Sequence, residues 1–151
     1  MDDGYDVWIG NNRGTMYSWD HVTLDSSVDN EYWMFTWADM GLYDGPANIT
    51  MIKEHNGEDK IFYIGYSQGT IQMFYALAHL ESSYFADNLY KVVQLAPCFV
   101  FNLEEDDRYP EYIDDWFLKL QDIGVYAFNG PNWEEDLEKI CNNFDEEKCN
   151  E

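Results

Sequence analysis

The fold of this chain is decided at residues 61–70, which read IFYIGYSQGT. Residues 61–66 are mostly apolar and rich in aromatic and branched side chains, which predicts a buried β-strand. Behind the motif Gly65-Tyr66-Ser67-Gln68-Gly69, apolar residues recur at helical spacing, at Ile71, Phe74, Tyr75 and Ala78. A strand, a G-x-S-x-G motif and a helix in this order predict a nucleophile elbow, in which a sharp turn holds a serine hydroxyl at the top of a sheet. A chance match to the motif within a loop is the alternative interpretation.

The two glycines of the motif, Gly65 and Gly69, have a steric reason in such a turn. The backbone of Ser67 is strained there, and neighbours that carry a Cβ would clash. The N-terminus of the following helix favours negative charge that develops beside the serine. Ser67 is therefore the predicted nucleophile.

Length and charge limit the possible functions. The chain has 151 residues, enough for one domain, whereas α/β folds built around a catalytic sheet often need about 200–250. Its net charge is −22, from 30 acidic and 8 basic residues, which argues against nucleic acid and anionic membrane surfaces as primary partners. Aromatic residues make up 18 % of the chain, so the acidic composition does not predict disorder.

The first strand is expected at residues 5–10, and a globular domain rarely starts its core so close to its first residue. One explanation is that Met1 is an internal methionine and that upstream sequence is missing; a genuinely short protein is the alternative. No secretory leader with a basic and then an apolar region is visible. No apolar run approaches 18 residues, so no membrane span is predicted.

The spacing of the predicted elements favours an α/β fold with a mostly parallel sheet and flanking helices. After the strand at 5–10 we expect an ordered loop with short helical pieces over 15–36. Helices are then expected around 37–42, from Pro46 to Asn56-Gly57, and from the elbow to about Leu80. A further buried strand is expected over 90–96. Beyond residue 101 an acidic run, an amphipathic stretch and a helix over 133–140 predict a separate helical region.

Three cysteines carry different expectations. Cys98 lies in an apolar run and is predicted to be a buried free thiol. On one straight helix, Cys141 and Cys149 would be about 12 Å apart, too far to bridge. If the intervening asparagines break the helix, a disulfide can close, contribute about 2–3 kcal/mol and imply an oxidising compartment. Two reduced surface cysteines are the alternative.

Several segments, in order and over nearly the whole chain, resemble the acid lipase family of α/β hydrolases, the gastric and lysosomal lipases and their relatives. These segments are residues 4–14, Tyr17-Ser18 with His21 and Thr23-Leu24, residues 35–40, 43–47, the elbow, residues 94–97, residues 123–128 and the Cys141/Cys149 pair. The family usually has histidine at the position of Tyr66. The resemblance implies that residues 1–101 are the central part of an α/β-hydrolase core and that residues 102–151 begin a helical cap.

The resemblance also implies roles. Ser67 would attack an ester carbonyl, and the backbone N–H of Gln68 would be one donor of the oxyanion hole. The triad's aspartate and histidine, and the second oxyanion donor, would lie outside these residues. The paired cap cysteines of the family support a Cys141–Cys149 disulfide, and the parent protein is expected to be secreted or to lie in a lysosomal or endomembrane lumen. The implied substrate is a lipid ester, with no cofactor and no metal.

Other candidate residues are weaker. His79 and His55 are too far from Ser67 to act as its base, and His21, which could lie at the correct edge of the sheet, is more simply a loop histidine bonded to its neighbours. Asn48 begins a glycosylation sequon. The acidic runs at 104–107 and 134–138 lack calcium-loop spacing and are expected to be solvated. A stripe at Ile113, Trp116, Phe117 and Leu120 is expected to pack in a core, with a lipid-facing lid as the alternative.

Three functions are compatible with these residues. The first is a serine ester hydrolase that acts on acylglycerols or sterol esters through an acyl-enzyme at Ser67, incomplete in this chain. The second is a truncated, non-catalytic relative that binds lipid or a partner through its cap. The third is a serine hydrolase acting on thioesters or peptides, which the elbow allows and the cap resemblance disfavours.

Overall fold

A computed structural model describes residues 3–98, 118–126 and 130–143 of the chain. It divides into two compact units. The first comprises residues 1–18 and 35–101, and the second comprises residues 19–34 and 102–151. The sheet and the predicted elbow belong to the first unit, which is described first.

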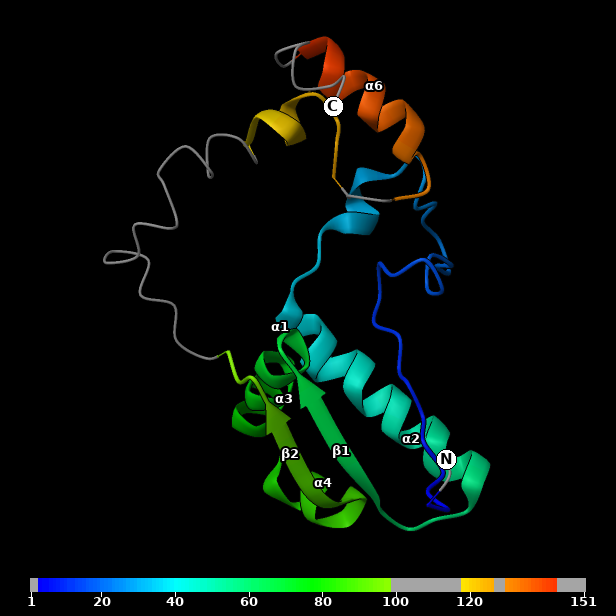
Figure 1. Ribbon diagram of the computed structural model, residues 1–151, viewed down its shortest axis with the longest axis vertical. Coiled ribbons are helices and arrows are strands. Elements are labelled where there is room, and N and C mark those ends of the chain that lie inside the picture. The colour runs from blue at the N-terminus through cyan, green and yellow to red at the C-terminus, as the bar shows by residue number, and fades with distance from the viewer. Residues whose placement is uncertain (1–2, 99–117, 127–129, 144–151) are drawn as a thin grey trace, which may run out of the picture. The chain divides into compact units, whose positions relative to one another are not determined.

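The sheet of the first unit has two parallel strands, β1 (Ile61–Tyr66) and β2 (Leu89–Leu95). Tyr63 lies opposite Val92, and Tyr66 opposite Leu95. Helices α3 (Gln68–His79) and α4 (Ser82–Asn88) connect the two strands, as Figure 1 shows in green. The parallel α/β arrangement is confirmed. β1 has the predicted bounds, residues 61–66. β2 begins and ends one residue earlier than the predicted range 90–96.

A second helical segment precedes β1. It consists of α1 (Trp37–Asp39), the π-helical turn η2 (Met40–Asp44) and α2 (Gly45–Asn56). Thr36 and Asp39 form a capping box at its start, and the backbone N–H of Thr36 that Asp39 accepts lowers the pKa of this carboxyl. At its end Gly57 takes a left-handed φ of 74°, a conformation that glycine adopts without strain. These helices confirm the two predicted between residues 37 and 57.

The core of the first unit lies between one face of the sheet and the helices α2, α3 and α4. Ile49, Met73 and Leu89 form its buried centre. Five partly buried residues pack against that centre: Ile61, Tyr63, Tyr84, Phe85 and Val92. The side chains that alternate with these on β1 face the other way, and Phe62, Ile64 and Tyr66 are 62–71 % exposed.

The predicted strand at residues 5–10 was wrong, because this segment has no regular structure. It runs beside α2 (Figure 1), where the ring of Trp8 meets that of His55 at 4.9 Å. Further along, Arg13 pairs with Asp44 through several hydrogen bonds of 2.8–3.2 Å, and this contact raises the pKa of the guanidinium. A strand needs a neighbour to accept its backbone bonds, and here the segment is held by side-chain partners instead.

Helix α4 was not expected from the sequence. It has seven residues, SSYFADN, of which two serines, an aspartate and an asparagine are more typical of caps and turns than of helix interiors. Its length gives fewer than two full turns, too short for a helical period to be recognised. Packing of Tyr84 and Phe85 onto the core stabilises it instead.

The second unit contains the 3-10 helix η1 (Asn30–Trp33), a helical segment at residues 118–122 and α6 (Trp133–Asn143). The short helical piece expected within 15–36 and the acidic helix expected from residue 133 are confirmed, and α6 continues to Asn143. Leu120 is buried, as core packing of the amphipathic stripe predicts. The other stripe residues (113, 116 and 117) and the acidic run at 104–107 lie outside the described residues.

We expect Ile49→Ala to lower the free energy of unfolding by about 2–4 kcal/mol, because a buried branched side chain leaves a cavity when truncated. The matched control is Met51→Ala in the same helix, where the residue is 46 % exposed and the loss should stay below about 1 kcal/mol. Urea unfolding followed by tryptophan fluorescence measures both. Equal losses in the two variants would contradict the core described here.

Candidate active site

Ser67 lies between the last residue of β1 and the first residue of α3, with φ 49° and ψ −114°. A non-glycine residue with positive φ is strained by about 1–3 kcal/mol and persists only where its surroundings enforce it. Among the described residues, Ala96 is the one other non-glycine residue with positive φ, at 48°. Because Tyr66 and Leu95 are partners in the sheet, both strained residues directly follow paired strand ends at its carboxyl edge.

Both peptide groups of Ser67 are hydrogen-bonded. Its N–H donates to the carbonyl of Leu95 at 3.1 Å. Its carbonyl accepts from the backbone N–H of Thr70 at 2.9 Å and from the Thr70 hydroxyl at 2.6 Å. The strained turn is therefore fixed on one side by β2 and on the other by the first turn of α3.

The two glycines of the motif differ in their surroundings. A Cβ at Gly65 would meet the side-chain Oε1 of Gln94 at 2.3 Å and the backbone carbonyl oxygen of Gly69 at 2.8 Å. Among the described residues, a Cβ at Gly69 would meet only the hydroxyl of Tyr63, at 3.7 Å, an ordinary contact. The steric requirement predicted for both glycines therefore applies to Gly65 and not to Gly69.

A chain of hydrogen bonds holds the carbonyl of Gly69, the last residue of the motif. The Tyr63 hydroxyl donates to the Gly69 carbonyl at 2.8 Å and accepts from the Gln72 amide at 3.3 Å. The Gln72 side chain in turn accepts from Asn12 at 2.9 Å. Burial raises the pKa of Tyr63, partly offset by the Gln72 bond, so the hydroxyl keeps its proton and remains a donor at neutral pH.

Gln68 is the first residue of α3 and is exposed. Its backbone N–H belongs to the first turn, whose N–H groups have no acceptor within the helix. Its side-chain amide lies 3.7 Å from the sulfur of Met40. An N–H directly after the serine, at the positive end of a helix dipole, suits an oxyanion.

Neither histidine of the first unit is placed to serve Ser67. His79 ends α3, twelve residues and about 18 Å along the helix, and its Nδ1 lies 2.8 Å from the Tyr75 carbonyl. His55 is near the end of α2, before β1 begins, where its ring contacts Trp8. His21 belongs to the second unit, and its Nδ1 accepts the backbone N–H groups of Thr23 and Leu24. This matches the interpretation of His21 as a loop histidine.

Two residues beside the motif carry contacts that the sequence did not indicate. Thr70, whose residue exposure is 0 %, accepts the backbone N–H of Cys98 at 3.0 Å while donating to Ser67. Gln94 on β2 has a buried side-chain amide with no partner among the described residues. A threonine next to the motif and a glutamine in a strand are ordinary in sequence, so only the tertiary contacts distinguish them.

The other predicted residues lie as follows. Cys98 is a free thiol, as expected, but it is half-buried and not fully buried. Cys141 lies in α6 and Cys149 outside the described residues, so their pairing stays a prediction. Asn48 lies within α2 and donates its side-chain amide to the Asp44 carbonyl at 2.9 Å. In the part of the chain that the structure describes, no group of His, Cys, Asp and Glu residues could hold a metal ion.

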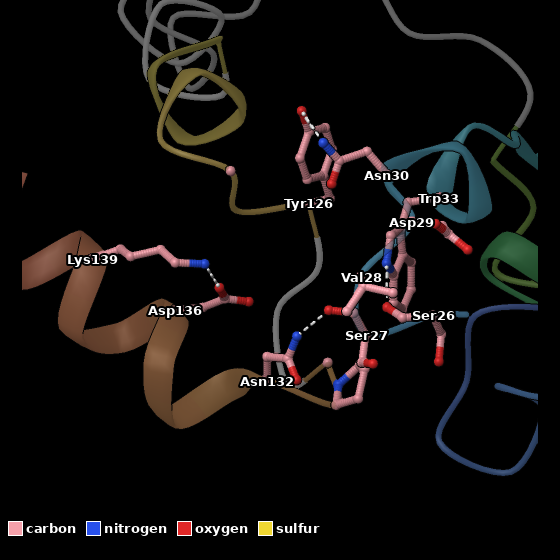
Figure 2. A pocket seen from close by; sticks show the side chains of 13 residues that line it. Ser26, Ser27, Val28, Asp29, Asn30, Trp33, Tyr126, Asn132, Asp136 and Lys139 are labelled. Carbon is pink, nitrogen blue, oxygen red and sulfur yellow. Dashed lines mark hydrogen bonds and ion pairs between the residues drawn. The ribbon is translucent and has the colours of Figure 1, made fainter. Parts of the chain in front are cut away.

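The second unit contains a cavity of about 270 Å³ near η1 and α6 (Figure 2). Its polar groups bond one another: Asn132 donates to the Ser27 carbonyl, Trp33 donates to the Ser26 carbonyl at 3.0 Å, and Lys139 pairs with Asp136 at 2.8 Å. Asp136 is buried, and Lys139 supplies its counter-charge. Because these groups already have partners, the cavity by itself indicates no chemistry.

Comparison with known proteins gives one family and several relatives. The model of the α/β hydrolase fold family matches residues 1–135. Lipase 1 of Drosophila melanogaster is 34 % identical over 146 residues, which cover 93 % of this chain and 33 % of that protein. Gastric triacylglycerol lipase of Bos taurus is 33 % identical over 138 residues, which cover 80 % of this chain and 34 % of that protein. Lipase member K of Mus musculus is 46 % identical over 77 residues, which cover 51 % of this chain and 19 % of that protein.

The chain therefore spans about a fifth to a third of the length of these relatives. Within the described residues, no helix has the length and apolar character needed to cross a membrane.

We expect Gly65→Ala to destabilise the protein by at least about 1–3 kcal/mol, because the added Cβ overlaps Gln94 and the Gly69 backbone. Gly69→Ala is the matched control. It should leave stability unchanged or raise it slightly, because alanine is favoured over glycine in a helix by up to about 1 kcal/mol. Thermal unfolding followed by circular dichroism measures both variants. A loss at Gly69 as large as that at Gly65 would contradict this difference.

Proposed function

This chain belongs to the α/β hydrolase fold family, and we propose that it is the elbow-bearing part of a serine ester hydrolase whose nucleophile is Ser67. The observation that carries the proposal is the strained backbone of Ser67 at the junction of β1 and α3. A surface serine in an ordinary turn has no need of positive φ. A nucleophile elbow does, because that conformation holds the hydroxyl clear of the strand and the helix.

The proposed reaction has two steps. Ser67 Oγ attacks the ester carbonyl carbon, its proton passes to a base, and the alcohol leaves with a proton as the acyl-serine forms. Water then attacks the acyl-serine, the carboxylic acid leaves, and Ser67 regains its proton. In both steps negative charge develops on the carbonyl oxygen, and the N–H of Gln68 is the donor that we assign to it.

The base and its acidic partner are assigned to parts of the protein outside these 151 residues. In this fold family the triad runs along the chain from serine to acid to histidine. The surroundings of His79 and His55 support this assignment. His79 lies at the far end of α3 from Ser67, His55 lies near the end of α2 before β1 begins, and each packs on an aromatic ring. The second oxyanion donor is likewise assigned to preceding sequence.

We propose a lipid ester as the substrate. The support is that relatives matching most of this chain are named lipases, one of them a triacylglycerol lipase. Residues 1–101 are proposed as the hydrolase core and 102–151 as the start of a cap. The parent protein is proposed to work in a secretory or lysosomal lumen, where a Cys141–Cys149 disulfide would persist. A non-catalytic lipid-binding relative is less favoured, because lipid binding gives no reason for strain at Ser67.

A fluorophosphonate probe tests the nucleophile. In the full-length protein that the gene encodes, we expect covalent labelling at Ser67 and none at that position in Ser67→Ala. The matched control is Ser18→Ala, in the same unit, which should label like the wild type. Peptide mass spectrometry locates the adduct. Labelling that is unchanged in Ser67→Ala, or absent from the wild type, would contradict the proposed function.

The disulfide has its own test. We expect protein purified from a secretory expression host to yield a Cys141–Cys149 linked peptide under non-reducing digestion, and Cys98 to react with iodoacetamide once unfolded. Cys141→Ser should lower the free energy of unfolding by about 2–3 kcal/mol, because the closed loop no longer restricts the unfolded chain. Two alkylated cysteines at 141 and 149 in the untreated protein would refute the pairing.

A further inference from the structure

We propose that Thr70 is a positioning residue for Ser67, acting through one hydroxyl that joins the two strained turns at the carboxyl edge of the sheet. The inference rests on the proposed function of Ser67 and adds to it. Thr70 lies in the first turn of α3 and is fully buried, so its hydroxyl cannot exchange partners with bulk water.

The hydroxyl makes two bonds of opposite direction. As a donor it bonds the carbonyl of Ser67 at 2.6 Å, and as an acceptor it receives the N–H of Cys98 at 3.0 Å. A threonine hydroxyl has one proton to donate, and here that proton is committed to Ser67. Because the N–H of Cys98 can only donate, the Thr70 hydroxyl must accept from it and is free to donate to Ser67.

The two ends of this bridge are the strained segments. One end is Ser67, whose φ is 49°. The other end is Cys98, which lies two residues after Ala96, and the φ of Ala96 is 48°. The Ser67 N–H also bonds Leu95, so the turn after β1 and the turn after β2 are joined at two points. These bonds therefore connect the segment around Ser67 with the segment around Ala96.

A hydroxyl that bonds the carbonyl three residues earlier is common at helix starts, and it can act without any role in catalysis. The bond to Cys98 distinguishes Thr70 from that common case, because it joins the helix to the segment that follows β2. A shift of about 1 Å in the serine lowers the rate of a positioned reaction by roughly 100-fold. A group that fixes the carbonyl of the serine can therefore control the rate without touching the substrate.

Two variants separate positioning from packing. Thr70→Val keeps the shape of the side chain but removes the hydroxyl, which leaves the Cys98 N–H without its acceptor. Thr70→Ser keeps the hydroxyl but removes a methyl group. A positioning role predicts that the valine variant is the more impaired, and a packing role predicts that the serine variant is.

The test uses the full-length protein and the second-order rate constant for fluorophosphonate labelling of Ser67, at a temperature where circular dichroism shows each variant folded. We expect Thr70→Val to label about 10- to 100-fold more slowly than the wild type, and Thr70→Ser within about 3-fold of it. With p-nitrophenyl butyrate as substrate, the valine variant should lower kcat and leave KM nearly unchanged. Thr70→Ala replaces the valine variant in this comparison if the latter does not fold.

The outcomes divide cleanly. The role of Thr70 is overturned, and the proposed function is left intact, if the valine variant labels at the wild-type rate. The same holds if the serine variant is impaired as much as the valine variant. A wild-type protein that is not labelled at Ser67 overturns the proposed function, and the role of Thr70 with it. Hydrogen exchange at the Cys98 amide gives an independent check: it should quicken in the valine variant and stay slow in the serine variant.

Discussion

The backbone of Ser67 is the constraint on which the rest of the first unit depends. A residue held at φ 49° must gain enough from its neighbours to offset about 1–3 kcal/mol of strain. The gain comes from the bonds to Leu95 and Thr70, which exist only when β2 lies beside β1 and α3 begins at Gln68. The register of the sheet and the position of the helix therefore determine the elbow together, and neither alone would hold it.

The same constraint explains why contacts gather beneath the motif. Gly65 must lack a Cβ because Gly69 turns back over it, with its carbonyl 2.8 Å from where a Cβ would be. That carbonyl is in turn bonded by Tyr63, two residues before Gly65 on the same strand. Strand and helix are thus bonded to each other across the turn, so that a change at Tyr63 or Gly65 reaches Ser67 through the backbone.

Local sequence predicted the elements in which neighbouring residues suffice. The apolar run of β1, the motif, and Gly57 after α2 each express a preference that needs no distant partner, and each was found where expected. Residues 5–10 show the opposite case. Their composition is that of a strand, but a strand requires a neighbour, and this segment binds along α2 instead. Short α4 is a helix because its aromatic residues reach the core, which its composition does not reveal.

The site divides in the same way. Ser67, Gln68 and Gly65 could be predicted because their roles follow from positions within five residues of one another. The contacts of Thr70 with Cys98 and of Gln94 with Gly65 join segments about thirty residues apart in the chain, and no local pattern marks them. Sequence alone thus predicted Ser67 as the nucleophile, while the contacts that hold its backbone became visible only when β2 was placed beside β1.

The acidic composition gives these short-range contacts added importance under the proposed function. A net charge of −22 produces a negative field that opposes the oxyanion formed during ester cleavage. Salt screens charges beyond about 8 Å at physiological ionic strength, so donors within hydrogen-bond distance outweigh the distant carboxylates. The N–H groups at the start of α3 are such donors, and their direction is fixed by the bonds of Ser67 to Thr70 and Leu95. The same negative field favours departure of a carboxylate product, so a surface that hinders the first step locally assists the release that follows.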